Sequence, residues 1–214
     1  MSSNKSTGAQ ERTALNPQRR PGQERVAQLL EAAAAVIAEK GYDATTMAEV
    51  AARAGAQIGS LYRFFPNKDV LASALIERFH TRVGEVFDAI DEQAGALSVP
   101  ALADALLDVL GGLRGETQAI VALLEGTLEL STRRLEFRRQ LRKRIASTLV
   151  NYCPKLGKSH AENVAAVVLQ AMKSMGALAK EMGNGVRPGA LAELRVMTRH
   201  YLEKTFADAE RQER

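Results

Sequence analysis

The sequence predicts an all-α protein with a small N-terminal helical unit and a larger helical body. Apolar residues recur at three- and four-residue steps in segment after segment, which is the spacing of one face of an α-helix. Gly or Pro residues separate these segments, and no stretch alternates with period two for long enough to predict a strand. The 214 residues are 46% hydrophobic and 25% charged, which suits a globular chain of one large domain or two small ones.

The N-terminal elements follow from local signals. Residues 1–21 are polar and contain the basic pair Arg19-Arg20, so they predict a flexible basic tail. A first helix is predicted from Gln23 to Lys40, and Gly41 ends it. Thr46 and Glu49 fit a capping box, in which each side chain would bond to the backbone N–H of the other residue.

That capping box opens a short helix that runs to Gly55, and a second short helix is predicted over residues 57–64, ended by Pro66. Asn67 can cap a much longer helix that reaches about Ile90. Further helices are predicted at 99–110, 116–130, 132–152, 160–183 and 189–207. The predicted organisation is a tail (1–21), a small N-terminal helical unit (22–66), a connecting helix (67–90), a helical body (91–208) and a C-terminal tail (209–214).

Composition excludes several classes of protein. A single cysteine, Cys153, cannot form a disulfide framework within one chain and suits a reducing compartment. The N-terminus has no apolar core of a secretory signal, and no run of roughly 18 apolar residues predicts a membrane span. We therefore expect a cytoplasmic protein with no membrane partner. The net charge of +4 and the pI near 9.3 favour anionic partners only mildly.

An enzyme is the first alternative, and the sequence offers little for one. The three histidines, His80, His160 and His200, are scattered, and neither an HExxH motif nor a cysteine cluster predicts a metal site. Gly157-Lys158-Ser159 is similar to the end of a P-loop, but Tyr152 stands where the leading glycine is required. No Gly-x-Ser-x-Gly elbow is present. We expect no catalytic residues, no cofactor and no metal.

Two short helices joined by a tight glycine-containing turn are typical of a helix-turn-helix, whose second helix enters the DNA major groove. Leu61 and Phe65 lie four residues apart, so one face of the second helix can pack inward. The exposed side would then carry five residues, Ile58, Gly59, Ser60, Tyr62 and Arg63. An arginine can form a two-pronged bond to guanine, and glycine permits close approach of the backbone.

The stretch GYDATTMAEVAARAGAQIGSLYRFFPNKDVL, within residues 26–79, resembles the DNA-binding signature of the TetR/AcrR family of bacterial transcriptional repressors. The resemblance rests on the spacing of Gly41-Tyr42, Thr45-Thr46, Ala54-Gly55, Gly59, Leu61-Tyr62, Phe65 and Lys68. It implies that residues 22–66 form a DNA-binding domain and residues 91–208 an effector-binding and dimerisation domain. It also implies base contacts from Ile58, Gly59, Ser60 and Arg63, and phosphate contacts from Thr46, Gln57, Tyr62 and Lys68.

Three residues depart from the family pattern. Met47 stands where a small hydroxyl residue often contacts phosphate. Gln57 opens the second helix in place of the usual Ser or Thr and is a poorer cap. Phe64 stands where many members have a phosphate-binding histidine. These departures bear on operator sequence and affinity rather than on the class of protein.

Two basic regions lie outside the helix-turn-helix. Arg19 and Arg20 are candidates for an arm that reaches into the minor groove, and the alternative is a solvated tail. A later helix carries a cluster that is more simply read as a solvated face, in which Arg138 or Arg142 could pair with Asp104 or Asp108. The cluster consists of Arg133, Arg134, Arg138, Arg139, Arg142, Lys143 and Arg144.

The last two predicted helices carry apolar stripes that could pack with their copies into a four-helix bundle, or pack within one chain. The residues predicted for such a dimer interface are Val168, Met172, Met175, Leu194, Met197 and Tyr201. The resemblance also implies a homodimer on a palindromic operator, and a pocket of unknown lining for a small, mostly apolar effector that releases the DNA. The alternative is a helical ligand- or partner-binding protein with weak or lost DNA binding.

Overall fold

The computed structural model describes residues 14, 17–125, 128–181 and 189–211, apart from the side chains of 114, 124–125 and 128–134. Within these residues it has nine α-helices, one 3₁₀ helix and no strand, which confirms the all-α prediction. The helices are α1 (Arg20–Lys40), α2 (Met47–Arg53), α3 (Ile58–Phe64), α4 (Lys68–Gln93), α5 (Val99–Asp108), α6 (Arg114–Glu125), α7 (Leu128–Tyr152), η1 (Pro154–Leu156), α8 (Lys158–Glu181) and α9 (Gly189–Arg211).

Several helix ends differ from the sequence prediction. Helix α1 begins at Arg20, because Pro21 occupies the first turn, where its missing N–H costs no hydrogen bond. Arg20 and Pro21 therefore belong to the helix and not to the predicted tail of residues 1–21. The boundaries predicted at 130 and 132 are also wrong, since α6 ends at Glu125 and α7 begins at Leu128.

The predicted caps are confirmed in the structure. The Thr46 side chain accepts from the N–H of Glu49, and the Glu49 carboxylate accepts from the N–H of Thr46. The Asn67 side chain accepts from the N–H of Val70 at 2.8 Å and starts α4. These two caps set the starts of α2 and α4, because each satisfies N–H groups that a helix start leaves unpaired.

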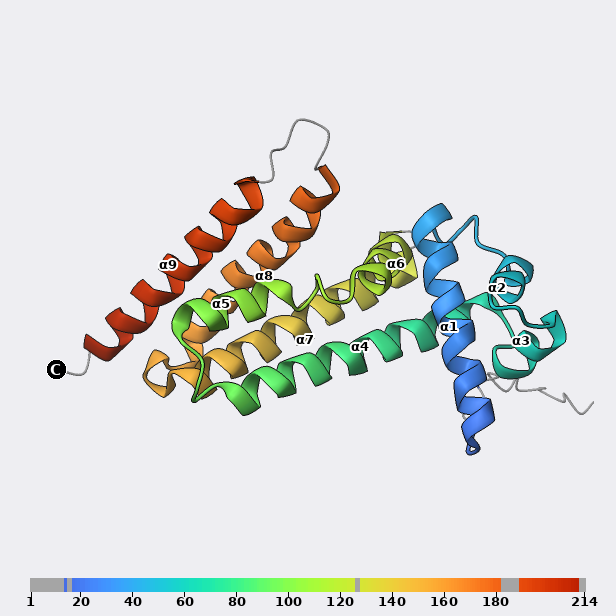
Figure 1. Ribbon diagram of the computed structural model, residues 1–214, viewed down its shortest axis with the longest axis horizontal. Helices are drawn as coiled ribbons and strands as arrows, with labels where there is room; N and C mark the ends of the chain where they lie inside the picture. The colour runs from blue at the N-terminus through green and yellow to red at the C-terminus, as the bar shows by residue number, and fades with distance from the viewer. Residues whose placement is uncertain (1–13, 15–16, 126–127, 182–188, 212–214) are drawn as a thin grey trace, which may run out of the picture.

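Figure 1 shows α1, α2 and α3 gathered at one end of the molecule, with α4 running from this unit along the body beside α7. Helix α8 packs along α7, α5 and α9 pack on α8 and on each other, and α9 ends on the side of the molecule opposite to α3. Helix α6 crosses back to pack against α1 and also contacts α4 and α7. The body therefore meets the N-terminal unit through both α4 and α6.

Two aspartates on α5 join that helix to α9. Asp104 accepts from Arg199, whose Nε lies 3.1 Å from both carboxylate oxygens, and Asp108 accepts from Arg195 Nη1 at 3.1 Å. The prediction that Arg138 or Arg142 would pair with these acids is wrong. Both arginines are exposed on α7, and α9 brings its own arginines to α5.

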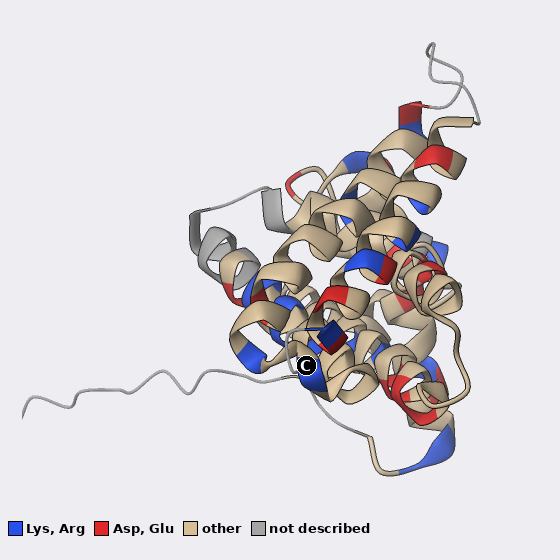
Figure 2. Cartoon of the chain, turned by 90° about the vertical axis from the view of Figure 1, so that its left-hand side faces the viewer, with Lys and Arg blue, Asp and Glu red and all other residues tan. Residues whose placement is uncertain are grey.

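The remaining charges are mixed in sign over the body. Figure 2 shows basic and acidic residues interspersed along the helices that face the viewer. Arg144 of α7 pairs with Asp91 of α4 at 2.9 Å and also with Asp88, so part of the basic cluster fastens α7 to α4. None of the helices in the described residues is both long and apolar enough to span a bilayer.

Candidate functional site

Helix α3 presents an exposed face at the end of the molecule. Its two large apolar residues on that face, Ile58 and Tyr62, are 43% and 50% exposed. Gln57, Gly59 and Arg63 are also exposed, while Ser60 is half-buried. Ile58 and Tyr62 are four residues apart and therefore adjacent on this helix of two turns. Exposing adjacent large apolar side chains to water is unfavourable. The face has the composition of a surface that a partner covers.

The opposite face of α3 is held by the core of the N-terminal unit. Leu61 and Phe65 are 0% and 1% exposed, as predicted, and they belong to the same buried cluster as Val50 and Ala51 of α2. Phe64 is also buried, so the residue in the usual histidine position packs inward and cannot contact phosphate. The short helix is therefore stabilised by packing rather than by its own length.

Gly59 stands in the middle of this exposed face. A Cβ atom built there would meet no protein atom within 4 Å, and its backbone is not in the left-handed region. The fold itself therefore does not require glycine at this position. Glycine within a helix costs roughly 0.5–1 kcal/mol relative to alanine, so its presence is best explained by close approach of something outside the chain.

The predicted phosphate-contacting residues differ in how free they are. The Thr46 hydroxyl donates to Glu49 Oε2 at 3.0 Å, so its proton is already used within the capping box. Lys68 Nζ donates to the backbone oxygens of Tyr42 and Asp43 at 3.0 and 3.2 Å, and an ammonium has a third proton to give. Gln57 caps α3 without a side-chain hydrogen bond and is exposed. Met47, the departure beside Thr46, is buried.

The start of α4 is fixed to the loop after α1. The Tyr42 hydroxyl donates to Asp69 Oδ1 at 2.5 Å, and Lys68 Nζ lies 4.5 Å from the centre of the Tyr42 ring. Burial and then the neighbouring Asp69 carboxylate raise the pKa of Tyr42 well above its usual value. The ionised phenolate is therefore disfavoured, and this hydroxyl keeps its donor role at physiological pH.

A second set of ion pairs stiffens the N-terminal unit. Arg53 of α2 makes two hydrogen bonds to the Glu39 carboxylate of α1, at 2.8 and 2.6 Å. Lys40 pairs with Glu49, and this bond, followed by those from Thr46, lowers the pKa of Glu49. All four groups are largely solvated, so they orient α2 against α1 and add little stability.

The two candidate arm residues lie at the start of α1. Arg19 is the N-terminal cap residue, and Arg20 pairs with Glu24 one turn later at 2.9 Å, with both side chains largely exposed. Arg20 is thus anchored on a helix rather than carried on a flexible arm, which corrects that part of the prediction.

A buried ionic cluster, which sequence reasoning missed, joins the N-terminal unit to the body. Glu116 of α6 is 8% exposed, accepts from Arg82 at 2.5 Å and forms an ion pair with Arg78 at 3.2 Å, both on α4. Arg78 also donates to the backbone oxygen of Ala27 on α1 at 2.9 Å. The four-residue spacing of Arg78 and Arg82 places them on one helix face, but nothing local points to a partner on α6.

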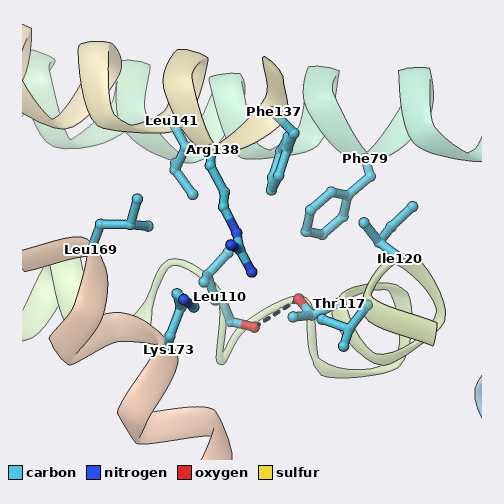
Figure 3. A pocket seen from close by; sticks show the side chains of 10 residues that line it. Phe79, Leu110, Thr117, Ile120, Phe137, Arg138, Leu141, Leu169 and Lys173 are labelled. Atoms are coloured by element: carbon cyan, nitrogen blue, oxygen red, sulfur yellow. Dashed lines mark hydrogen bonds between the residues drawn. The ribbon is translucent and has the colours of Figure 1, made fainter. Parts of the chain in front are cut away.

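The body contains an apolar pocket of about 100 Å³. Figure 3 shows Phe79 of α4, Ile120 of α6, and Phe137 and Leu141 of α7 around it, with Arg138 and Lys173 reaching in from α7 and α8. Sequence reasoning left the lining of such a pocket unknown. Two phenyl rings and two cations contribute, and their separation along the chain hid their proximity.

The ring of His80 stacks on Phe137, one of the residues that line this pocket, with 4.9 Å between the ring centres. Its Nε2 atom is buried without a hydrogen-bond partner in the described structure, and burial lowers the pKa of His80 below the ordinary 6.5. The nearby Glu77 opposes this shift but is the weaker influence. The imidazole is therefore favoured in its neutral form when the protein is folded.

This pKa shift predicts a loss of stability in mild acid. Because the unfolded chain binds the His80 proton more tightly, the stabilisation is complete above pH 6.5 and falls as the pH drops toward the folded pKa. We expect the free energy of unfolding in urea to fall between pH 7.5 and pH 5.5, and to fall less in His80→Phe, which keeps the stacked ring. The exposed His160→Gln serves as control and should behave as the native protein. An equal fall in His80→Phe would contradict the assignment.

The residues predicted for a dimer interface divide into two groups. Val168 and Met172 are 0% and 1% exposed, so they belong to the core of a single chain and are not available to a second copy. Met175, Leu194 and Tyr201 are half-buried, and Met197 is 59% exposed. The other exposed apolar residues on the same two helices are Val167 and Val196, one position away from Val168 and Met197.

Comparison with known proteins finds a family and relatives that match the N-terminal unit. Residues 29–75 match the family described as "Bacterial regulatory proteins, tetR family". The HTH-type transcriptional repressor KstR of Rhodococcus jostii is 44% identical over 57 residues, which are 26% of this chain and 27% of KstR. The chain spans no more than 58% of the length of the curated relatives it matches.

Solved structures extend the likeness over the whole fold. A transcriptional regulator from Aquifex aeolicus VF5 superposes with a TM-score of 0.65 at 22% identity, covering 85% of this chain and 99% of the other. FadR from Bacillus subtilis, solved in complex with stearoyl-CoA, gives a TM-score of 0.59 at 18% identity over 84% and 97% of the two chains. At these identities the likeness establishes a shared fold.

Proposed function

We propose that this chain, whose residues 29–75 match the tetR family of bacterial regulatory proteins, is not an enzyme but a ligand-responsive transcriptional repressor that binds a palindromic operator as a homodimer. The observation that carries the proposal is the exposed face of α3. It combines an arginine, a glycine that the fold does not need, and two large apolar side chains in water.

In the proposed complex, α3 lies in the major groove. Ile58, Gly59 and Ser60 contact base edges, and Arg63 forms the two-pronged hydrogen bond to guanine. Gln57 and Tyr62 reach phosphates on either side, and Lys68 adds the third proton of its ammonium. Thr46 would need to exchange its bond to Glu49 for a phosphate, so we give it the smallest part.

Two copies are required because one helix of two turns reads only a few base pairs. We propose that α8 and α9 of each copy form the interface through their exposed apolar residues, Val167, Val196 and Met197, with the half-buried Met175, Leu194 and Tyr201 beside them. Helices α8 and α9 pack on each other within one chain, so both can contribute to a single interface. A twofold interface of this kind presents the two α3 helices to successive half-sites.

The ligand response is proposed to pass through α6. This helix forms one wall of the pocket with Thr117 and Ile120, packs on α1, and holds Arg78 and Arg82 of α4 through Glu116. A ligand that prefers one position of α6 therefore biases the orientation of both α1 and α4. It changes operator affinity only by the difference in its affinity for the two arrangements.

The proposal is tested by selecting duplexes from a random pool with the purified full chain in low salt and without added ligand. We expect enrichment of an inverted repeat with half-sites about one helical turn, or roughly 10 base pairs, apart. Enrichment without symmetry would contradict the homodimer. No enrichment over the starting pool would contradict DNA binding and favour a helical ligand- or partner-binding protein.

A further inference from the structure

The exposed face of α3 is divided into two rows that differ in chemistry. Residues four positions apart lie on the same side of a helix, so Ile58 and Tyr62 form one row, and Gly59 and Arg63 form the other. Ile58 and Tyr62 are 43% and 50% exposed, whereas Leu61 on the inner side of the helix is buried. Helix α3 therefore carries an apolar row beside the row that holds its arginine.

The apolar row is fixed in place at both ends of the helix. Ile58 is the first residue of α3, and the turn that begins there is closed by the N–H of Ser60, which donates to the backbone oxygen of Gln57 at 2.9 Å. At the other end the ring of Phe65 is buried in the core. The branched side chain of Ile58 is stiff at its first torsion angle. A helix that is held in this way presents Ile58 to a partner in one orientation.

The major groove offers one apolar group that suits such a side chain. Thymine carries a C5 methyl group there, whereas guanine, adenine and cytosine present hydrogen-bond donors and acceptors. Ile58 has no polar side-chain atom, so covering those donors and acceptors would leave them unpaired at a cost in free energy. A thymine methyl group has no such cost. The N-terminal residues of a recognition helix are the ones that contact base edges, and Ile58 is the first of them.

We propose that Ile58, with the ring of Tyr62 beside it, contacts the C5 methyl group of a thymine in each operator half-site, near the guanine bound by Arg63. This inference rests on the proposed operator binding and identifies a base that the operator must contain. A helix of 7 residues is about 10 Å long, which corresponds to about three base-pair steps. The thymine is therefore expected within about three base pairs of the guanine.

The test removes single methyl groups from the duplex that the selection described above enriches. Each thymine of the half-sites is replaced in turn by deoxyuracil, which keeps the base pairing and lacks only the methyl group. At the thymine that Ile58 contacts, the affinity of the full chain should fall about fourfold for one half-site and about 15-fold for both, as expected for the loss of one buried methyl group from each. Affinity is measured by fluorescence anisotropy at fixed salt, and deoxyuracil outside the half-sites should have no effect.

A second pair of duplexes separates the methyl group from the thymine–adenine pair. Cytosine and 5-methylcytosine are each placed opposite guanine at the same position. The methylated duplex should bind about fourfold more tightly than the unmethylated one, because it restores the apolar contact. Equal affinities would contradict a contact between Ile58 and the methyl group.

Substitutions identify Ile58 as the residue responsible. Ile58→Ala keeps a strong helix former at an exposed position, so its melting temperature should be unchanged, and it should bind thymine and deoxyuracil duplexes equally. Ile58→Gln should select adenine at this position, because glutamine forms a two-pronged bond to that base. The matched control is Leu135→Ala, which removes an aliphatic side chain that is 64% exposed on α7. It should keep the preference for thymine.

The inference is overturned if the enriched half-sites hold no thymine within about three base pairs of the guanine. It is also overturned if the native chain binds thymine and deoxyuracil duplexes equally at every position, or if Ile58→Ala keeps the preference for thymine. Each of these results leaves operator binding in place and contradicts the methyl contact alone. A selection that enriches no duplex would instead contradict operator binding, and the methyl contact with it.

Discussion

Replacing Arg63 with alanine is expected to abolish selective operator binding while leaving the fold intact. Arg63 is exposed on the outer face of α3, and no described acid pairs with its guanidinium, which lies 5.9 Å from the centre of the Phe64 ring. A lost two-pronged contact to guanine costs about 1–3 kcal/mol, and a homodimer loses it twice. Affinity for the selected operator should fall at least about 30-fold, as measured by fluorescence anisotropy at fixed salt.

A loss of net positive charge could also weaken DNA binding, so the control must carry the same change in charge. Arg139→Ala on α7 is such a variant, because its side chain is exposed on the body and far along the chain from α3. It should leave the operator affinity unchanged. The base-reading role of Arg63 is contradicted if Arg63→Ala lowers the affinity for random duplex as much as the affinity for the operator.

Replacing Phe65 with alanine is expected to cause the largest loss of stability in the N-terminal unit. The ring of Phe65 is 1% exposed and anchors the end of α3 in the core. The Phe65 backbone N–H donates to the backbone oxygen of Leu61 at 2.8 Å and closes the last turn of the helix. Removal of a buried phenylalanine costs about 3–5 kcal/mol, partly through the cavity it leaves. Because α3 has only 7 residues and cannot persist alone, we expect its amides to exchange with solvent rapidly in this variant.

A matched control separates local from general destabilisation. Phe206 of α9 is 4% exposed and lies in the body, in contact with the ring of Tyr152. Phe206→Ala should lower the overall melting temperature but keep the amides of α3 protected and operator binding intact at low temperature. If the two variants lose α3 protection and DNA affinity equally, the N-terminal unit does not depend on Phe65 in the way described.

Local signals in the sequence predicted the N-terminal unit well. Thr46 and Asn67 each cap a helix by bonding to a residue three positions later, so both caps could be predicted from the sequence. The burial of Leu61 and Phe65 follows from their spacing on one helix. The start of α1 was misplaced by three residues, because the prediction did not use the tolerance of a first helical turn for Pro21.

The body was predicted less well because its contacts join distant residues. Helical periodicity identified the apolar face of α8, but it could not tell whether Val168 faces the same chain or a second copy. The acids on α5 could pair with arginines from several helices, and the packing of α9 on α5 decides for Arg195 and Arg199. The pocket combines residues from four helices, and no local pattern brings Phe79 beside Phe137.

The cluster around Glu116 has a consequence for how strongly any effector must act. One Glu116 oxygen pairs with both Arg78 and Arg82 of α4, and the other is buried without a hydrogen-bond partner among the described residues. A shift of α6 away from α4 would therefore leave the Glu116 charge unpaired. Separating such partners costs free energy that scales with their burial. Binding in the pocket should therefore be possible without operator release, because release also requires the free energy to separate Glu116 from the arginines. A molecule that binds the pocket but has too little preference for the arrangement with α6 displaced would not release the operator. Selectivity among effectors would then depend on the contact between Glu116 and α4 as well as on the pocket.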